Sequence, residues 1–221
     1  MPWNEYFNIA GLPPGSYRSI AGYAAESLIT GRAMQCGYNL FFKAWRDSPY
    51  DGVLDHNGVL FRIEIKGSTT DSLSVTSGGR SGAQINREAE DRTHLISVEE
   101  VDFVLGVSNL NGDCYILPID VIQIFNRQSL SFDKIVLFKE KWRIFTGYTS
   151  DGIALSTEDI RRGFLRIDLD SLITIATKLG IAIPERADVY SFEWLGFQGG
   201  YIQNLDLQKY MAIQIWKKLF S

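Results

Sequence analysis

The sequence is poor in several residue types that define common classes of protein. It contains two cysteines, Cys36 and Cys114, and two histidines among 221 residues. The cysteines have neither the spacing of a metal site nor that of a disulfide framework, and neither histidine has a partner at a metal-ligand spacing. These scarcities argue against a zinc module and a disulfide-stabilised secreted domain, and they indicate a reducing compartment.

Long apolar runs and an excess of positive charge are also missing. No apolar run approaches the roughly 18 residues that a membrane-spanning helix needs. The N-terminus has no basic segment followed by an apolar one, as a signal peptide would. We therefore expect a cytoplasmic protein with no membrane partner. Because 22 basic residues stand against 26 acidic ones, any binding of nucleic acid must use local basic clusters or a metal that offsets carboxylates.

What the chain does contain is typical of one globular domain. It is 45% hydrophobic, and its 13 Phe, 10 Tyr and 5 Trp provide aromatic side chains for a sizeable core. Residues 19–36 have the pattern of a helix that Ser19 can cap. One face of this helix is expected to carry Ile20, Tyr23, Ala24, Leu28 and Met34.

The rest of the pattern predicts strands first and helices later. Strands are expected within residues 36–42, in a hairpin at 48–68, and at 101–108, 114–119 and 134–138. Helices are expected at residues 83–92, 119–125, 156–164, 168–180 and 205–220. This order predicts an α/β fold, with a central mixed sheet flanked by helices and a helical C-terminal elaboration.

The hairpin places charged residues where they can meet. Asn57-Gly58 predicts a two-residue type I′ turn, which pairs position 51 with position 64. Asp51 and Glu64 would then face each other with Cβ atoms about 4.5–5.5 Å apart. Because successive side chains alternate between the faces of a strand, Lys66 shares their face. The other face carries Val59, Phe61, Ile63 and Ile65.

Two facing carboxylates repel each other unless a cation lies between them. A divalent metal would convert the repulsion into coordination, and oxygen ligands suit Mg²⁺. A metal held by Asp51 and Glu64 could bind a phosphate oxygen and lower the pKa of a water molecule, while Lys66 steadies the developing charge. The alternative is a solvent-facing strand with weak surface ion pairs, and a slip in register would also separate the two carboxylates.

These residues resemble the signature of the PD-(D/E)XK nuclease superfamily. That signature has an aspartate at the start of one strand and (D/E)-x-K at the end of the next, here Asp51 and 64–66. Pro49-Tyr50-Asp51 replaces a direct Pro-Asp. Residues 19–36 resemble the first helix of the superfamily, with Glu26 at the position of its additional acidic residue. Residues 99–120 resemble the following core strands, so that the likeness spans about residues 19–125.

The resemblance implies a restriction-endonuclease-like core over residues 1–147, elaborated by the helices of 148–221. It also implies Mg²⁺ as the cofactor, bound by Asp51, Glu64 and the backbone carbonyl of Ile65, and it makes Lys66 the catalytic lysine. Glu26 would act on the metal indirectly or through water. A solvated helix glutamate is the alternative for Glu26.

Residues 78–92 follow the catalytic strand, where bound double-stranded DNA would pass. Their polar side chains are of the types that contact base edges or phosphates, and we take as DNA-binding candidates Arg80, Gln84, Asn86 and Arg87. The alternative is a solvated helix with internal arginine–glutamate pairs.

Among the functions that the resemblance allows, a type II restriction endonuclease is favoured. The residues beyond the core provide material for sequence recognition and for a homodimer, which palindromic cleavage would need. An intron homing endonuclease or a Holliday-junction resolvase is the alternative, although resolvases are usually compact and basic. A catalytically inactive DNA-binding protein on the same fold is a third possibility, against which the intact Asp51, Glu64 and Lys66 argue.

Overall fold

The centre of the molecule is a mixed β-sheet. A computed structural model describes residues 11–43, 48–78, 93–184, 190–193 and 201–221. The sheet has five strands in the order β1-β2-β3-β7-β8. Their bounds are β1 Asn39–Phe42, β2 Gly52–His56, β3 Val59–Ser68, β7 Phe103–Ser108 and β8 Cys114–Pro118. Only the β3–β7 pair is parallel among these neighbours, and the others are antiparallel.

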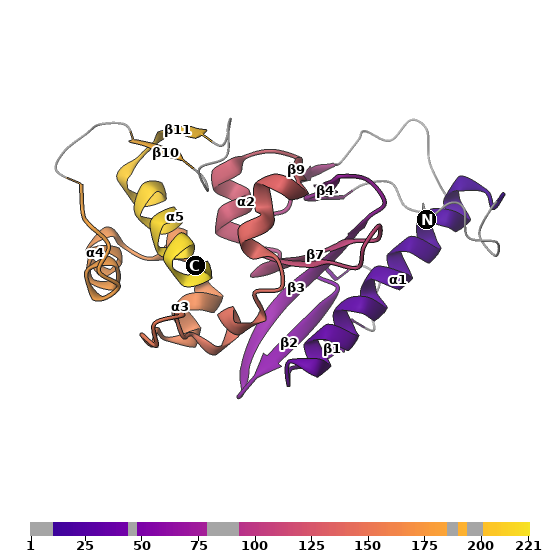
Figure 1. Cartoon of the computed structure of the whole chain (residues 1–221), viewed down its shortest axis with the longest axis horizontal. Helices are drawn as coiled ribbons and strands as arrows, with labels where there is room; N and C mark the ends of the chain where they lie inside the picture. Colours follow the sequence, from indigo (N-terminus) through magenta and orange to yellow (C-terminus); the bar gives the residue numbers. More distant parts are fainter. Residues whose placement is uncertain (1–10, 44–47, 79–92, 185–189, 194–200) are drawn as a thin grey trace.

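The strands of the sheet differ in burial. All six residues of β7 are buried, as expected of an apolar run that lies between two other strands. Strand β1, at one edge of the sheet, has no buried residue. The mixed α/β fold that the sequence predicts is confirmed, and Figure 1 shows the sheet between α1 and the C-terminal helices.

Helix α1 spans Pro14–Gln35 and begins earlier than the sequence pattern predicts. Pro14 occupies the first helical turn, where its fixed φ and missing N–H cause no loss. Ser19 therefore lies inside the helix, and its Oγ donates to the Gly15 carbonyl oxygen at 3.1 Å. The predicted end is confirmed, because Gly37 follows the helix with a φ of 82°, a conformation that glycine adopts readily.

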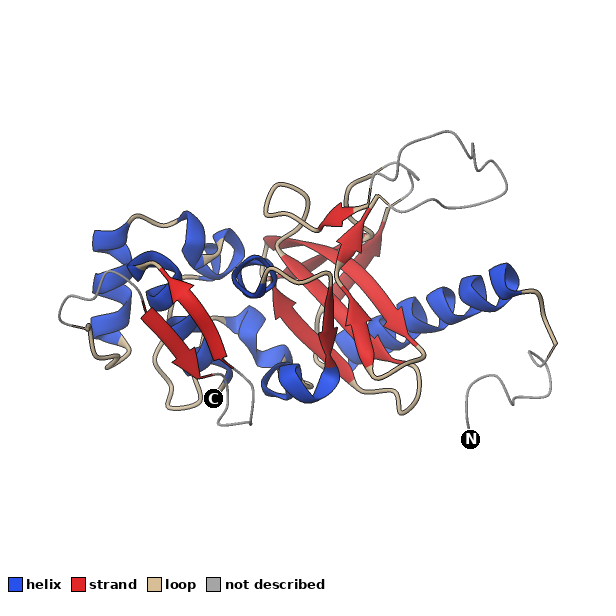
Figure 2. Ribbon diagram, turned by 90° about the horizontal axis from the view of Figure 1, so that it is seen from above, coloured by secondary structure: helices blue, strands red, loops and turns tan. Residues whose placement is uncertain are grey.

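The predicted apolar face of α1 is wrong. The buried residues of the helix are three alanines and one isoleucine: Ala21, Ala25, Ala33 and Ile29. Tyr23 and Met34, by contrast, are 69% and 68% exposed. Small side chains at a spacing of four allow the helix to lie close to the sheet, whereas the larger ones face away. Figure 2 shows that the first turns of α1 extend beyond the sheet, and no residue from Pro14 to Ile20 is buried.

The part of the chain after β8 is mostly helical. Its elements are α2 Ile119–Phe125, η2 Phe132–Phe138, η3 Trp142–Thr146, α3 Thr157–Arg162, η4 Phe164–Arg166, α4 Leu169–Lys178, β10 Tyr190–Glu193, β11 Tyr201–Leu205 and α5 Leu207–Phe220. Two features differ from the prediction. The expected strand at 134–138 is part of the 3₁₀ helix η2, which buries Ile135 and Phe138 at the three-residue spacing of such a helix. In addition, β10 and β11 form an antiparallel hairpin within the elaboration.

Shorter strands complete the described structure. Strand β4, Ser72–Ser74, pairs with β9, Ser129–Ser131, and β5, Thr76–Ser77, pairs with β6, His94–Leu95. Among the described residues, no helix has the length and hydropathy of a membrane-crossing segment.

A buried carboxylate joins the sheet region to the C-terminal helices. Asp120, at the start of α2, has no exposed surface. Its Oδ2 accepts hydrogen bonds from Phe164 N at 2.5 Å, Leu165 N at 3.2 Å and Trp216 Nε1 at 2.9 Å. Gly163 approaches so closely that a Cβ atom there would lie 2.6 Å from Asp120 Oδ1. The carboxylate of Asp120 thus connects η4 and α5 to α2, the helix that follows β8.

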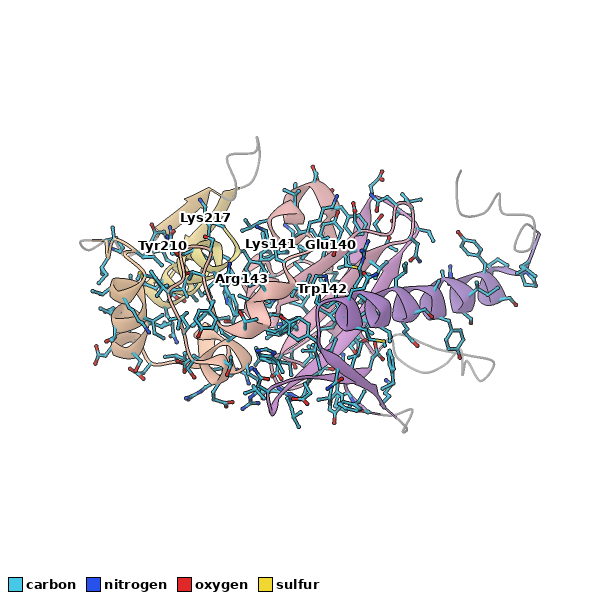
Figure 3. All side chains as sticks on the ribbon, turned by 60° about the horizontal axis from the view of Figure 1, so that its bottom comes forward. Glu140, Lys141, Trp142, Arg143, Tyr210 and Lys217 are labelled. Carbon is cyan, nitrogen blue, oxygen red and sulfur yellow. The ribbon has the colours of Figure 1, made fainter. Side chains whose placement is uncertain are left out.

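Glu140 also makes hydrogen bonds to the sheet, at β8, which is an edge strand. Glu140 has a φ of 54°, and its backbone N–H donates to the Cys114 carbonyl oxygen at 2.8 Å. Its carboxylate accepts from Cys114 N at 3.0 Å and from Trp142 Nε1 at 2.9 Å. Figure 3 labels this segment, Glu140 to Arg143, together with Tyr210 and Lys217 of α5. Glu140 therefore satisfies backbone groups at the strand edge that would otherwise be open to pairing.

Candidate active site

The predicted hairpin turn is confirmed. His56 pairs with Val59, and Asn57 and Gly58 have φ values of 53° and 84°, as a type I′ turn requires. The Asp55 Oδ1 atom accepts a hydrogen bond from Gly58 N at 2.9 Å, which stabilises the turn. The turn sets the register of the hairpin from His56 and Val59 as far as Gly52 and Ile63.

At the far end of the hairpin, the pairing differs in detail from the expectation. The regular register ends at Gly52 and Ile63. The Asp51 N–H donates to the Ile63 carbonyl oxygen at 2.9 Å, so Asp51 does not lie squarely opposite Glu64. Strand β1 approaches closely at the neighbouring residue, since a Cβ atom at Gly52 would lie 2.6 Å from the carbonyl oxygen of Phe41.

The Asp51 side chain is held by two neighbours. Its Oδ2 accepts a hydrogen bond from Ile65 N at 2.8 Å. Its Oδ1 lies 3.0 Å from Lys43 Nζ. Sequence reasoning missed Lys43, which follows β1 and belongs to no recognisable motif. The Asp51 carboxylate is thereby directed toward β3, where Glu64 and Lys66 lie.

Glu64 and Lys66 form an ion pair on β3. The Lys66 Nζ atom lies 2.6 Å from Glu64 Oε1. Glu64, in the middle of β3, is only 8% exposed although it carries an ionisable side chain. Burial raises the pKa of Glu64, and the negative charge of Asp51 adds to this effect, while Lys66 opposes it. The two carboxylates are therefore close enough to interact electrostatically, as the sequence predicts.

Helix α1 brings Glu26 to the same group. Burial raises the pKa of Glu26, the charge of Asp51 raises it further, and the charge of Lys43 lowers it. The structure thus places the side chains of Glu26, Asp51 and Glu64 in one electrostatic environment. Glu26 comes from α1, Asp51 directly precedes β2, and Glu64 lies on β3.

A close contact between α1 and β3 sets the position of Glu26. A Cβ atom at Gly67 would lie 2.7 Å from Ala25 Cβ, which is shorter than side-chain carbons tolerate, so that only glycine fits there. The helix is also held by Asn109, whose Nδ2 donates to the Ala21 carbonyl oxygen at 3.2 Å. Since Gly67 follows Lys66 and Ala25 precedes Glu26, this contact sets the spacing between α1 and β3 beside these two side chains.

The donor set is suited to a hard divalent cation. Carboxylate oxygens of Asp51 and Glu64 are the ligands that Mg²⁺ prefers. Alternate residues of a strand direct their backbone groups to the same side. On β3, the Ile63 carbonyl oxygen accepts a hydrogen bond from Asp51 N, and Ile65 N donates one to Asp51 Oδ2. The carbonyl oxygen of Ile65 is therefore directed toward the Asp51 side as well.

In this structure, however, the carboxylates of the site are paired with lysines. Within the described ranges, no three acidic, histidine or cysteine side chains converge closely enough to hold a metal ion. One oxygen of Asp51 and one of Glu64 instead lie within ion-pair distance of Lys43 and Lys66. A cation that binds both carboxylates would have to compete with these ammonium groups.

Other candidates lie elsewhere. Arg80, Gln84, Asn86 and Arg87, together with the helix expected at 83–92, lie outside the described residues. The histidines and cysteines have separate surroundings: His56 packs edge-to-face against Tyr38 with ring centroids 5.3 Å apart, and His94 contacts Glu100 at 2.9 Å. Cys36 and Cys114 are free, and burial raises the pKa of the Cys114 thiol to about 12.

The comparison with protein families agrees with the sequence motif. A family model described as PD-(D/E)XK endonuclease matches residues 19–133. A solved structure of a bacterial homing endonuclease, I-Ssp6803I, is similar at 18% sequence identity with a TM-score of 0.46; the similarity covers 57% of this chain and 91% of that chain. Among the curated proteins, none matches the chain.

Proposed function

The chain belongs to the PD-(D/E)XK endonuclease family, and from this we infer that it is a Mg²⁺-dependent endonuclease that cuts double-stranded DNA at a specific sequence. The observation that carries the proposal is the grouping of Asp51, Glu64 and Lys66 at one end of the hairpin. Glu26 belongs to the same group, because the charge of Asp51 contributes to the raised pKa of Glu26. A type II restriction endonuclease is the role that we favour.

We assign roles to these residues from their positions. Asp51, Glu64 and the Ile65 carbonyl would bind Mg²⁺, which when bound polarises a phosphate oxygen and makes a water molecule more acidic. Glu26 would orient water beside the carboxylates. The Lys66 ammonium group, held by Glu64 at 2.6 Å, would donate a hydrogen bond to the attacking water or to the phosphate as negative charge develops.

The reaction that these residues would promote is phosphodiester hydrolysis. The water oxygen bonds to phosphorus, the bond from phosphorus to the leaving sugar oxygen breaks, and that oxygen takes up a proton. Because acidic residues outnumber basic ones, 26 to 22, the chain lacks the broad positive charge on which shape-dependent binding relies. We therefore propose that base contacts supply much of the specificity, from Arg80, Gln84, Asn86 and Arg87 and from the C-terminal elaboration.

We further propose a homodimer, because a two-fold axis matches the symmetry of a palindromic site. The free cysteines are in keeping with action in a reducing cytoplasm.

Digestion of a large unmethylated phage genome tests the proposed function. With Mg²⁺ we expect discrete fragments whose ends share one short sequence that is symmetric about a two-fold axis, and no cleavage in excess chelator. Full activity in chelator would contradict the metal dependence. A single cut at a long asymmetric site would indicate homing, cleavage of four-way junctions alone would indicate a resolvase, and binding without cleavage would indicate an inactive DNA-binding protein.

Gly67→Ala tests the contact that positions Glu26. The new methyl group would push α1 away from β3, and we expect the cleavage rate to fall by about tenfold to a hundredfold, since displacements near 1 Å can have such effects. The double variant Ala25→Gly/Gly67→Ala removes the opposing Cβ atom and should recover much of the cleavage rate. It should not recover thermal stability, because glycine within a helix costs about 1 kcal/mol.

The readouts for Gly67→Ala are the single-turnover cleavage rate and Tm, measured for both variants and the unsubstituted protein. An unchanged cleavage rate in Gly67→Ala would show that the distance between α1 and β3 does not matter for the reaction.

A further inference from the structure

Lys43 lies beside the carboxylates of Glu26, Asp51 and Glu64, although it belongs to no sequence motif. Its backbone N–H donates to the Asp51 carbonyl oxygen at 2.9 Å. Its Nζ lies 3.0 Å from Asp51 Oδ1 and donates to the Ser48 carbonyl oxygen at 3.4 Å. These contacts join the end of β1 to the start of β2, and they direct the ammonium group toward the Asp51 carboxylate.

Each of the two carboxylates proposed as metal ligands has a lysine beside it. Lys43 contacts Asp51 at 3.0 Å and Lys66 contacts Glu64 at 2.6 Å. The positive charge of Lys43 also acts on the neighbouring acids, since it lowers the pKa of Glu26 as well as that of Glu64. Two ammonium groups thus offset the mutual repulsion of three carboxylates.

The Lys43–Asp51 pair differs from an ordinary surface pair in its burial. Its side chains are 27% and 21% exposed. By comparison, Lys218 and Asp151, which lie 2.8 Å apart, are 34% and 48% exposed. Solvent weakens exposed pairs strongly, whereas loss of one partner from a more buried pair leaves a charge that solvent compensates less well.

We propose that Lys43 is a positioning residue that occupies the Asp51 carboxylate in the metal-free protein and competes with the divalent cation for it. This inference rests on the proposed function, because it assigns Asp51 to the metal. Lys43 keeps Asp51 oriented toward β3 and limits carboxylate repulsion until the cation arrives. A bound cation would take the place of the Lys43 ammonium group at the Asp51 carboxylate, and the Lys43 backbone N–H would keep its hydrogen bond to the Asp51 carbonyl oxygen.

Lys43→Met tests the competition, because methionine keeps much of the aliphatic side chain and removes the charge. By calorimetric titration, we expect Lys43→Met to bind Mg²⁺ about twofold to tenfold more tightly, the range implied by a partly screened ion pair. In chelator, its Tm should fall by about 2–4 °C. In saturating Mg²⁺, this difference in Tm should close.

Two controls separate competition at Asp51 from a change in net charge. Lys218→Met removes the same charge from a distant aspartate pair, and its Mg²⁺ affinity should equal that of the unsubstituted protein. In an Asp51→Asn background, Lys43→Met should no longer lower Tm in chelator. A fall in Tm that persists in that background would show that Lys43 acts elsewhere and would overturn the proposal.

The titrations distinguish failure of this inference from failure of the proposed function. If the unsubstituted protein binds Mg²⁺, Asp51→Asn does not, and Lys43→Met binds with unchanged or weaker affinity, then the role of Lys43 is overturned and the metal site stands. If the unsubstituted protein binds no Mg²⁺, or Asp51→Asn binds it equally well, both the metal site and the competition are overturned.

Discussion

Asp51→Asn is expected to lower the rate of DNA cleavage by about three orders of magnitude, with little change in the fold. A bound metal provides several kcal/mol of stabilisation to developing charge, and each 1.36 kcal/mol corresponds to about a tenfold change in rate. Asparagine keeps the size of the side chain and an oxygen that can accept from Ile65 N, the bond that aspartate makes at 2.8 Å. It lacks the negative charge through which a carboxylate binds a divalent cation more strongly than a neutral amide does.

Asp55→Asn is the matched control for this experiment. Asp55 lies on the same strand as Gly52, but at the turn end of the hairpin, where its Oδ1 accepts from Gly58 N at 2.9 Å. An asparagine can make the same bond, so cleavage should be unchanged. The rates are measured in single turnover on plasmid DNA with saturating Mg²⁺, and circular dichroism verifies the fold. If Asp51→Asn cleaves within tenfold of the unsubstituted rate, Asp51 is not the essential ligand that we propose.

Asp120→Ala should produce the largest loss of stability, about 3–5 kcal/mol in the free energy of unfolding. The substitution removes the acceptor of three N–H donors, from Phe164, Leu165 and Trp216. Each buried donor left without a partner costs about 1–3 kcal/mol, and a cavity adds to the loss. Urea titration measures the effect. A loss below about 1 kcal/mol would mean that water or a rearrangement satisfies the donors.

Asp120→Asn provides a test in which the acceptor is retained. Burial raises the pKa of the Asp120 carboxyl above its value in the unfolded chain. The contribution of Asp120 to stability is therefore fully present below the unfolded-state pKa, and it declines as pH rises toward the folded-state pKa. Asparagine does not titrate, so Asp120→Asn should become more stable relative to the unsubstituted protein as pH rises from about 4 to about 8.

Comparing the two proteins at each pH removes the contributions of other carboxylates, including Glu26 and Glu64. The difference between their unfolding free energies should change in one direction only. A difference that stays constant with pH would show that Asp120 has the same affinity for a proton in the folded and unfolded states.

The hairpin could be predicted because its information is local. Asn57-Gly58 selects the turn, and the alternation of the following strand separates Ile63 and Ile65 from Glu64 and Lys66. The family motif lies in the same short stretch, and the match over residues 19–133 confirms the resemblance. The departure of Asp51 from the regular register, through its hydrogen bond to the Ile63 carbonyl oxygen, has no signal in the sequence.

The buried face of α1 could not be obtained from periodicity. Large apolar residues at helical spacing normally indicate the core, and on this basis Tyr23 and Met34 were expected to point inward. The helix instead approaches β3 so closely, at Ala25 and Gly67, that small residues form the contact. The apolar run at 134–138 was ambiguous for a related reason, since a short run does not distinguish a strand from a buried helical turn.

The amino-acid order alone was sufficient for the α/β class and the hairpin, because hydrophobic periodicity and turn residues are local signals. The same order predicts Asp51, Glu64 and Lys66 as site residues, through a motif that lies within one short stretch. Lys43, the burial of Asp120 and the position of Glu26 depended on the tertiary structure. A lysine beside an aspartate eight residues later, or an aspartate beneath a tryptophan 96 residues later, leaves no periodic trace in the chain. Such contacts arise only when separate elements pack, and the charge and burial of each group then follow from what surrounds it.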